Sequence, residues 1–221
     1  MQMKRASSTV KAILFDLDGT IIDTYEVILR SMRYTMKTIL GEDYSAAQLM
    51  KKVGQPLKTQ MADYARSEEE CDEMLRVYRA YQAQIHDKTV KAFSNTQNTL
   101  EALKAAGYLL GIVTSKLHAP ALHGLEFCGL EGYFSCLVGA DDCSKHKPDP
   151  FPVVYGAQLL GVDVSACIYV GDSPYDIQAG NAAGAITIAA LWGMFAEDEL
   201  MQEKPNFACR DIADMLPLLA Q

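Results

Sequence analysis

The chain has 221 residues, of which 49% are hydrophobic and 22% charged, a composition typical of ordinary globular proteins and not of disordered or fibrous ones. Its formal net charge is −8 and it contains no dense cluster of lysines and arginines, so we expect no nucleic-acid partner. No apolar run approaches the roughly 18 residues that span a bilayer, and the first ten residues lack the apolar stretch of a secretory signal, so we expect a cytoplasmic protein without membrane contact.

The first predicted element is a strand over residues 10–15, which form a continuous apolar run. A long stretch without any convincing strand follows, from about Asp23 to Lys91. Within it, Ser67 and Glu70 form a capping box that starts a helix. Apolar residues then continue at amphipathic spacing, at Cys71, Met74, Tyr78, Tyr81 and Ile85.

This helical stretch is too long for a simple crossover between two strands of one sheet. We therefore interpret residues 23–91 as a small helical domain inserted into a sheet domain, which consists of residues 1–22 and 92–221. Two strands, one before Asp23 and one after Lys91, would serve as hinges. We expect the aromatic and methionine positions of the insertion to form its own core, as at Tyr64, Met74 and Tyr78.

From residue 92 onward, short apolar runs alternate with helical patterns, which is typical of βαβ units and a parallel sheet. The predicted strands cover residues 108–113, 136–139, 167–170 and 185–189. The predicted helices cover residues 96–106, 152–160 and 175–183, and each precedes a glycine suited to ending a helix, namely Gly107, Gly161 and Gly184. These elements predict an α/β fold with helices on both faces of the sheet.

The six cysteines predict free thiols, because they form neither a CxxC pair nor a zinc-ribbon spacing. Cys143 and His146 could be two metal ligands, but no matching second pair is nearby. Free thiols that behave as small apolar residues are the usual case in the cytosol.

Four polar motifs lie at or just beyond the carboxyl ends of predicted strands, which is the edge where open α/β sheets bind ligands. The first follows the strand at 10–15 and contains Asp16 and Asp18, with Gly19 permitting a tight turn. Two carboxylates at this spacing project to the same side of the strand. A calcium loop is a weak alternative, because it would continue with acidic ligands and end in glutamate, whereas Thr20-Ile21-Ile22 follows here.

The second and third motifs supply hydroxyl groups and a cation. Thr114-Ser115-Lys116 follows the strand at 108–113, where hydroxyls and free backbone N–H groups would form an anion cradle. Lys147 lies in a Lys-Pro-Asp-Pro loop that its prolines would stiffen. Alone each is ordinary, because many strands end in Thr-Ser and a lone surface lysine is normally solvated.

The fourth motif, over residues 171–176, adds Asp172 and Asp176, although Asp-Ser can also be a simple helix N-cap. The order of acid pair, hydroxyl, lysine and acid pair at successive strand ends is hard to obtain by chance. Three carboxylates that converge from separate strands would repel one another unless a cation lay among them. Oxygen ligands select a hard ion, and Mg²⁺ is the natural one when phosphate completes its coordination.

Together, the motifs DLDGT, TS, KPDP and GDSPYD resemble those of the haloacid dehalogenase superfamily of phosphohydrolases. The resemblance covers nearly the whole chain, with the inserted helical segment in the place of the superfamily's cap. It implies a Rossmann-like core with the strand order 5-4-1-2-3, which periodicity alone does not predict.

The resemblance also implies roles for the carboxylates. Asp16 would be the nucleophile, already ionised at neutral pH, and would form an aspartyl phosphate. Asp18 would protonate the leaving oxygen and later deprotonate the attacking water. Asp172 would bind Mg²⁺ together with Asp16 and the backbone carbonyl of Asp18, and Asp176 would be a further carboxylate on the metal side or behind it.

The phosphoryl group and the rest of the substrate would contact other residues. Thr114 and Lys147 would bind the transferring phosphoryl group, and Ser115 would contribute mainly its backbone N–H. In the inserted segment, Gln55 and Lys58 are our candidates for selecting the substrate, because the cap loops of the superfamily reach the crevice.

Differences from particular relatives narrow the function. Dehalogenases of the superfamily lack the acid corresponding to Asp18, so its presence favours phosphoryl transfer. β-Phosphoglucomutases often carry Glu-Asp where this chain has Gly171-Asp172, and their caps tend to place an arginine near residues 54–57. Because that loop has no arginine here, the chain looks most like the phosphoglycolate phosphatase and pyrophosphatase branch.

The favoured prediction is therefore a Mg²⁺-dependent phosphatase for a small phosphorylated metabolite, similar to phosphoglycolate phosphatase. An inorganic pyrophosphatase and a phosphomutase are the alternative enzymes. A binding protein without activity is disfavoured, although fold does not fix function, because every catalytic position is filled. We expect a monomer or a homodimer.

Overall fold

The computed structural model describes residues 10–219. The first nine residues, which bear on a secretory signal, lie outside this part, as do the outer limits of the expected sheet domain at residues 1 and 221. Among the described residues, no helix combines the length and the apolar character needed to cross a membrane.

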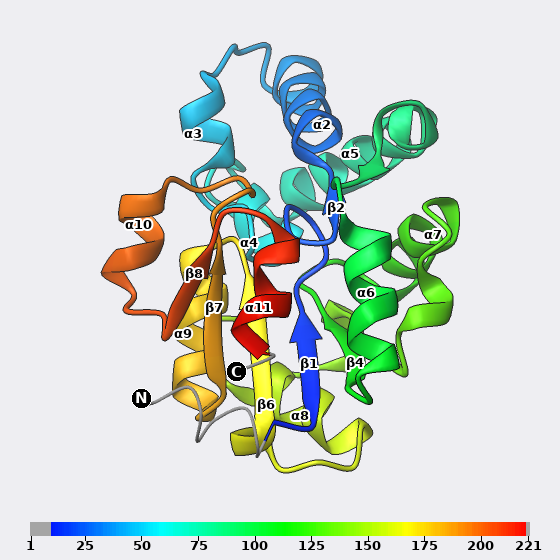
Figure 1. Ribbon diagram of the computed structural model, residues 1–221. Coiled ribbons are helices and arrows are strands. Elements are labelled where there is room, and N and C mark those ends of the chain that lie inside the picture. Colours follow the sequence, from blue (N-terminus) through cyan, green and yellow to red (C-terminus); the bar gives the residue numbers. More distant parts are fainter. Residues whose placement is uncertain (1–9, 220–221) are drawn as a thin grey trace.

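A six-stranded parallel sheet forms the centre of the molecule, with the strand order β5-β4-β1-β6-β7-β8 (Figure 1). With the short strands β2 and β3 left out of the count, the first five strands along the chain have the order 5-4-1-2-3 that the resemblance implied. All five expected strands are confirmed, with ends shifted by two residues at most. The six strands are β1 (Ala12–Phe15), β4 (Leu109–Val113), β5 (Cys136–Val138), β6 (Cys167–Gly171), β7 (Ile186–Ala190) and β8 (Phe207–Cys209).

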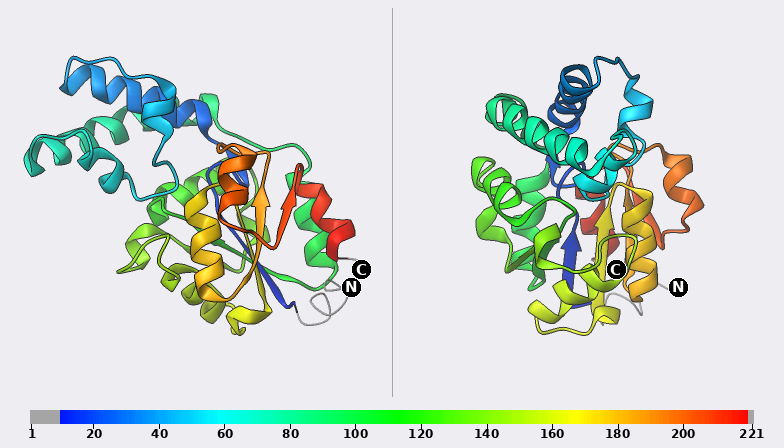
Figure 2. Two further views of the ribbon diagram at one scale, coloured as in Figure 1. Left: turned by 90° about the vertical axis from the view of Figure 1, so that its left-hand side faces the viewer. Right: turned by 180° about the vertical axis from the view of Figure 1, so that it is seen from behind.

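Helices cover both faces of this sheet, because successive side chains of each strand point to opposite sides. In β1, Phe15 belongs to an apolar cluster with Leu100 of α6, whereas Leu14 belongs to another cluster with Val153 of α8. Figure 2 shows from behind that α8 and α9 lie on the face opposite α6 and α11. These helices are α6 (Thr96–Ala105), α7 (His118–Phe127), α8 (Phe151–Leu159), α9 (Pro174–Ala183), α10 (Glu197–Gln202) and α11 (Met215–Leu219).

The helical insertion lies over the carboxyl edge of the sheet (Figure 1). Its chain enters through β2 (Ile22–Asp23) and leaves through β3 (Lys91–Ala92), which pair in antiparallel register. Buried methionines of α2 and buried Met74 and Tyr78 of α5 share one apolar cluster, while Tyr64 is only partly buried against it. The inserted helices are α2 (Tyr25–Ile39), α3 (Ala46–Met50), α4 (Leu57–Ala62) and α5 (Glu68–Thr89).

The start of α5 corrects one expectation. Ser67 is the N-cap and its hydroxyl accepts from the N–H of Glu70 at 3.2 Å, as the capping box requires. The reciprocal bond is not made, because the Glu70 carboxylate accepts instead from the backbone N–H of Arg66 at 2.7 Å and pairs with the Arg66 guanidinium. Of the two hydrogen bonds of the expected capping box, the structure therefore has the one to the Ser67 hydroxyl and lacks the one to the Glu70 side chain.

Candidate active site

Asp16 is the first residue after β1, the strand that lies between β4 and β6 in the sheet. Its backbone N–H donates to the carbonyl of Val170 at 2.8 Å, so the ladder between β1 and β6 fixes the backbone of the residue. The residue is only 4% exposed. A carboxylate at a rigid strand end, with little rotational freedom, is well placed to act as a nucleophile.

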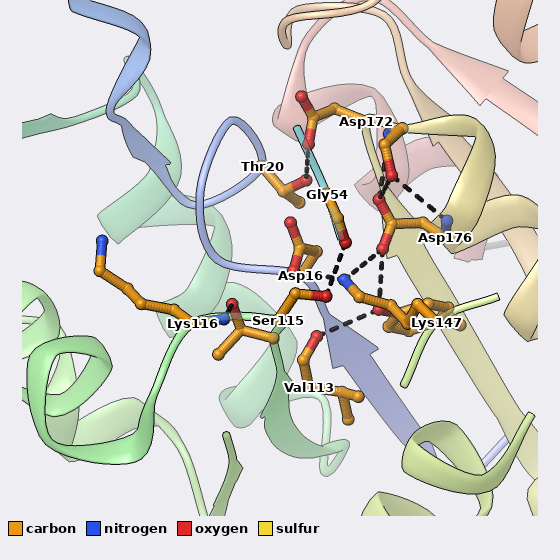
Figure 3. A network of polar contacts seen from close by, with 12 residues as sticks. Asp16, Thr20, Gly54, Val113, Ser115, Lys116, Lys147, Asp172 and Asp176 are labelled. Carbon is orange, nitrogen blue, oxygen red and sulfur yellow. Dashed lines mark hydrogen bonds and ion pairs between the residues drawn. The ribbon is translucent and has the colours of Figure 1, made fainter. Parts of the chain in front are cut away.

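Lys147 joins the carboxylates of two different elements (Figure 3). Its ammonium lies 2.7 Å from Oδ1 of Asp16 and 2.5 Å from Oδ1 of Asp176 on α9. Burial alone would lower the pKa of Lys147, but these two carboxylates raise it well above its usual value. Lys147 is therefore a cation beside Asp16.

Asp172 follows β6 and is held from two sides. Oδ1 accepts from the Thr20 hydroxyl at 3.0 Å, and Oδ2 accepts from the backbone N–H of Met194 at 2.8 Å. Gly19 makes this approach possible, because its φ is +86° and a Cβ there would lie 2.2 Å from Oδ2 of Asp172. The tight turn expected at Gly19 thus also brings the DLDGT loop against the acid of the fourth motif.

Burial makes the carboxylates of this site costly to ionise. Burial raises the pKa of Asp16 to about 7, although Lys147 opposes the shift. Burial also raises the pKa of Asp172 well above its usual value, and the charges of Asp16 and Asp176 add to this effect. Carboxylates that are this costly to ionise gain most from a bound cation.

The arrangement suits a hard divalent cation. Carboxylate oxygens of Asp16, Asp172 and Asp176 all lie within 4.8 Å of one another, and all three residues are buried. Oxygen-only donors of this kind match Mg²⁺. The structure thus brings together the expected Asp16 and Asp172, with Asp176 as the third carboxylate.

The carboxylate of Asp18 has different surroundings. Its side chain is partly exposed, and Oδ1 accepts from the Lys116 ammonium at 2.8 Å. Lys116 also donates its backbone N–H to the Thr114 hydroxyl at 3.2 Å, which leaves the Thr114 proton free for another acceptor. The Ser115 hydroxyl donates to the carbonyl of Gly54 at 2.6 Å, so the second motif contacts the helical insertion.

Two residues of this site were not assigned roles from the sequence. Lys116 stands directly after Thr-Ser at a strand end, a position that could have suggested its contact with Asp18. The Tyr169 hydroxyl lies 3.0 Å from Oδ1 of Asp176 and 3.1 Å from the Val113 carbonyl. Tyr169 is an inward residue of a buried strand, and no sequence signal separates it from a core tyrosine.

A cavity of about 640 Å³ opens beside these residues, between the sheet edge and the insertion. Asp16, Asp18 and Thr114 line it from the sheet side. Gln55 and Lys58, the candidates for substrate selection, line it from the insertion. The Lys58 ammonium is well exposed and lies 3.6 Å and 3.8 Å from carboxylates of the same insertion.

Comparison with known proteins agrees with this architecture. The model of the haloacid dehalogenase-like hydrolase family matches residues 13–190. The chain belongs to this family and is a hydrolase, which confirms the resemblance inferred from the motifs.

Relatives match over nearly their whole length. Pyrophosphatase PpaX of Bacillus velezensis is 37% identical over 207 residues, which are 94% of this chain and 95% of that protein. Pyrophosphatase PpaX of Bacillus pumilus is 34% identical over 212 residues, 96% of this chain and 97% of that protein. A solved structure described as a predicted phosphoglycolate phosphatase from Haemophilus somnus has a TM-score of 0.88 at 28% identity, and covers 96% of this chain and 99% of its own.

Proposed function

We propose that this protein is a Mg²⁺-dependent phosphatase that transfers a phosphoryl group first to Asp16 and then to water. The observation that carries the proposal is the position of Asp16. This carboxylate is buried, lines the cavity and lies 2.7 Å from the Lys147 ammonium. Membership of the hydrolase family and relatives named as pyrophosphatases support it.

In the first step, an oxygen of Asp16 forms a bond to phosphorus while the bond from phosphorus to the leaving oxygen breaks. Asp18, in its protonated form, gives its proton to the leaving oxygen, which departs as a hydroxyl group. Lys147 offsets the repulsion between the carboxylate and the phosphoryl oxygens. Thr114, whose proton is free, donates to a phosphoryl oxygen.

In the second step, a water oxygen attacks phosphorus and the bond between Asp16 and phosphorus breaks. Asp18 takes a proton from the water, which restores the proton it gave in the first step. Asp16 is regenerated as a carboxylate and phosphate leaves. The net change is one phosphoester and one water converted to one hydroxyl compound and one phosphate, or one pyrophosphate and one water converted to two phosphates.

We propose that Asp16, Asp172 and Asp176, with the backbone carbonyl of Asp18, hold the Mg²⁺. When bound, the ion supplies positive charge to the phosphoryl oxygens. Thr20 and the N–H of Met194 orient Asp172 for this task through their hydrogen bonds.

The relatives support two substrates. Those named PpaX support pyrophosphate, and the structural neighbour named for phosphoglycolate supports phosphoglycolate. In both compounds the leaving group carries a negative charge of its own, as phosphate or as carboxylate. We propose a substrate of this class, which keeps the phosphoglycolate phosphatase-like activity expected from the sequence alongside pyrophosphate hydrolysis.

The test is release of phosphate by the purified protein from pyrophosphate, phosphoglycolate, sugar phosphates and nucleotides, with Mg²⁺ and with excess chelator. We expect release that requires Mg²⁺ and is greatest for one of the first two compounds. A phosphomutase would form the same intermediate but would need a sugar bisphosphate and would release little phosphate. Equal release in chelator, or none from any compound, would contradict the proposal.

A further inference from the structure

We infer that Arg79, on the helix α5 of the insertion, binds the anionic group that the substrate carries beyond the scissile phosphoryl group. This inference rests on the proposed function, since it concerns how the same cavity recognises the leaving group. The ligand class is a second phosphate or a carboxylate. Our two candidates from the sequence do not offer an unpaired cation, because Gln55 is neutral and Lys58 already lies near two carboxylates.

The cavity offers few cations for such a group. Of the lysines and arginines among residues 10–219, three line it: Lys58, Arg79 and Lys116. Lys116 is bound to Asp18 at 2.8 Å. Lys58 lies within 4 Å of both Glu68 and Asp72. Each therefore already faces negative charge.

Arg79 differs from both, because it has no hydrogen bond or ion pair with any residue in the described part of the chain. Three other arginines of the described residues, Arg66, Arg76 and Arg210, pair with carboxylates. Arg66 pairs with Glu70, and Arg76, one turn before Arg79, pairs with Glu73. An arginine that lines a cavity without a protein partner has all five of its N–H donors available to a ligand.

The neighbours of Arg79 on α5 that line the cavity are polar but carry no fixed positive charge. Tyr78 and Gln82 also line the cavity, but Gln82 donates to the Tyr78 hydroxyl at 3.2 Å. His86, one further turn along, is bonded to Asp87 at 2.7 Å. Tyr78, Gln82 and Nε2 of His86 keep hydrogen-bonding capacity of their own, but Arg79 is the arginine or lysine of α5 that lines the cavity.

A substrate with two anionic groups would need one cation for each group. In the proposed reaction Lys147, which is buried against Asp16, would serve the attacked phosphoryl group. A second anionic group in the same cavity needs another cation, and a guanidinium binds phosphate or carboxylate through two parallel hydrogen bonds. Because Arg79 belongs to the insertion and Asp16 to the sheet, a substrate with two anionic groups would bridge the two parts.

Binding of non-hydrolysable ligands to the full chain with Mg²⁺ tests this inference without requiring turnover. Methylenediphosphonate imitates pyrophosphate, phosphonopropionate imitates phosphoglycolate, and methylphosphonate lacks the second anionic group. We expect wild-type protein to bind at least one of the first two more tightly than methylphosphonate. Arg79→Ala should weaken that ligand by about 10–100-fold, the loss of a charge-assisted hydrogen bond, and leave methylphosphonate unchanged.

The matched control is Arg76→Ala, which removes an arginine of the same helix that does not line the cavity. It should leave all three affinities unchanged, and Arg79→Lys should keep part of the preference because it keeps the charge. The response of the two longer ligands distinguishes a phosphate from a carboxylate subsite. The inference would be overturned if Arg79→Ala and Arg79→Lys lost affinity equally for all three ligands. It would also be overturned if neither variant lost affinity for any of them.

The proposed function can fail separately from this inference. Arg79-dependent binding without any phosphate release would contradict the phosphatase and keep the subsite. Mg²⁺-dependent phosphate release with no preference of wild-type protein for a second anionic group would keep the phosphatase and contradict the subsite.

Discussion

At the residue scale, two carboxylates of one loop have different surroundings and, in our proposal, different tasks. Asp16 is buried against Lys147, whereas Asp18 is partly exposed and pairs with Lys116. Asp16→Asn should abolish phosphate release, because an amide is not a nucleophile at neutral pH. Asp18→Asn should lower the rate by about 10²–10⁴-fold, the usual contribution of positioned proton transfer. Release by either variant near the wild-type rate, with exposed Asp43→Asn as the control, would contradict these roles.

The raised pKa values predict that Mg²⁺ binding depends on pH. Asp16 has a pKa of about 7 in the metal-free protein, so below that pH it holds a proton that a metal must displace. Affinity should therefore rise with pH by about tenfold per unit for each displaced proton, and level off once the carboxyl groups ionise without help. Burial raises the pKa of Asp172 as well, so it can add a second proton.

Calorimetric titration with Mg²⁺ at about pH 6 and about pH 8 checks this prediction, since those values lie on either side of the Asp16 pKa. Buffers of different ionisation enthalpy would count the protons released. Asp16→Asn should release fewer protons than wild type. Equal affinity at both pH values and no proton release would show that the carboxylates are already ionised before the metal binds.

The sequence could predict the residues of the site that belong to short motifs at strand ends. Asp16, Asp172 and Lys147 converge as expected, because the carboxyl ends of parallel strands meet at one edge. Arg79 could not be found in this way. It lies on a helix of the insertion, where its position over the cavity depends on the packing of that insertion and leaves no trace in local spacing.

At the element scale, the loop before α4 joins the insertion to the site. Gly54 has a φ of +99°, and an added Cβ would lie 2.6 Å from the Ser173 hydroxyl oxygen. Its carbonyl accepts from Ser115. Gly54→Ala should therefore push the loop away from the sheet edge and lower kcat/KM, on the order of 10²-fold if the displacement reaches an ångström.

Gly41→Ala is the matched control for this change. Gly41 also lies in the insertion and has a φ of +72°, but nothing lies within 4 Å of an added Cβ. Both variants carry backbone strain, so kcat/KM and thermal unfolding measured for the pair separate strain from the clash at Ser173. Equal activity of the two variants would show that the contact at Gly54 does not affect catalysis.

Strands and helices could be predicted from the sequence wherever the apolar run or the helical pattern was long enough. The central strands are continuous buried runs, and α6, α8 and α9 appear within one residue of their expected limits. β8 was missed because it has three residues at the sheet edge, of which only Cys209 is buried. The strand order came from the resemblance alone, since local periodicity carries no information about which strands pair.

At the scale of the whole molecule, the insertion is connected to the sheet part by two short chain crossings and a few polar contacts, beside apolar side chains of both parts that share one cluster. The chain crosses twice, through β2 and β3, which have two residues each. Side chains add the bond from Ser115 to Gly54 and a contact of 2.9 Å between His123 of α7 and Asp87 of α5. Because the chain crossings are short and the polar contacts are few, we expect an insertion that moves relative to the sheet, as lids over active sites do.

Hydrogen exchange of backbone amides tests this motion in the full chain. With Mg²⁺ and methylenediphosphonate bound, we expect slower exchange in the loop at residues 53–57 and in β2 and β3, because a ligand held by Asp16's site and by Arg79 would draw the two parts together. The middle of α2, whose packing lies within the insertion, should be unchanged. Methylphosphonate should protect the loop less, since it cannot reach both parts. If neither ligand alters exchange at the loop or at the two strands, the insertion is a rigid accessory to the sheet, and water must be excluded from the aspartyl phosphate by the cavity walls as they stand.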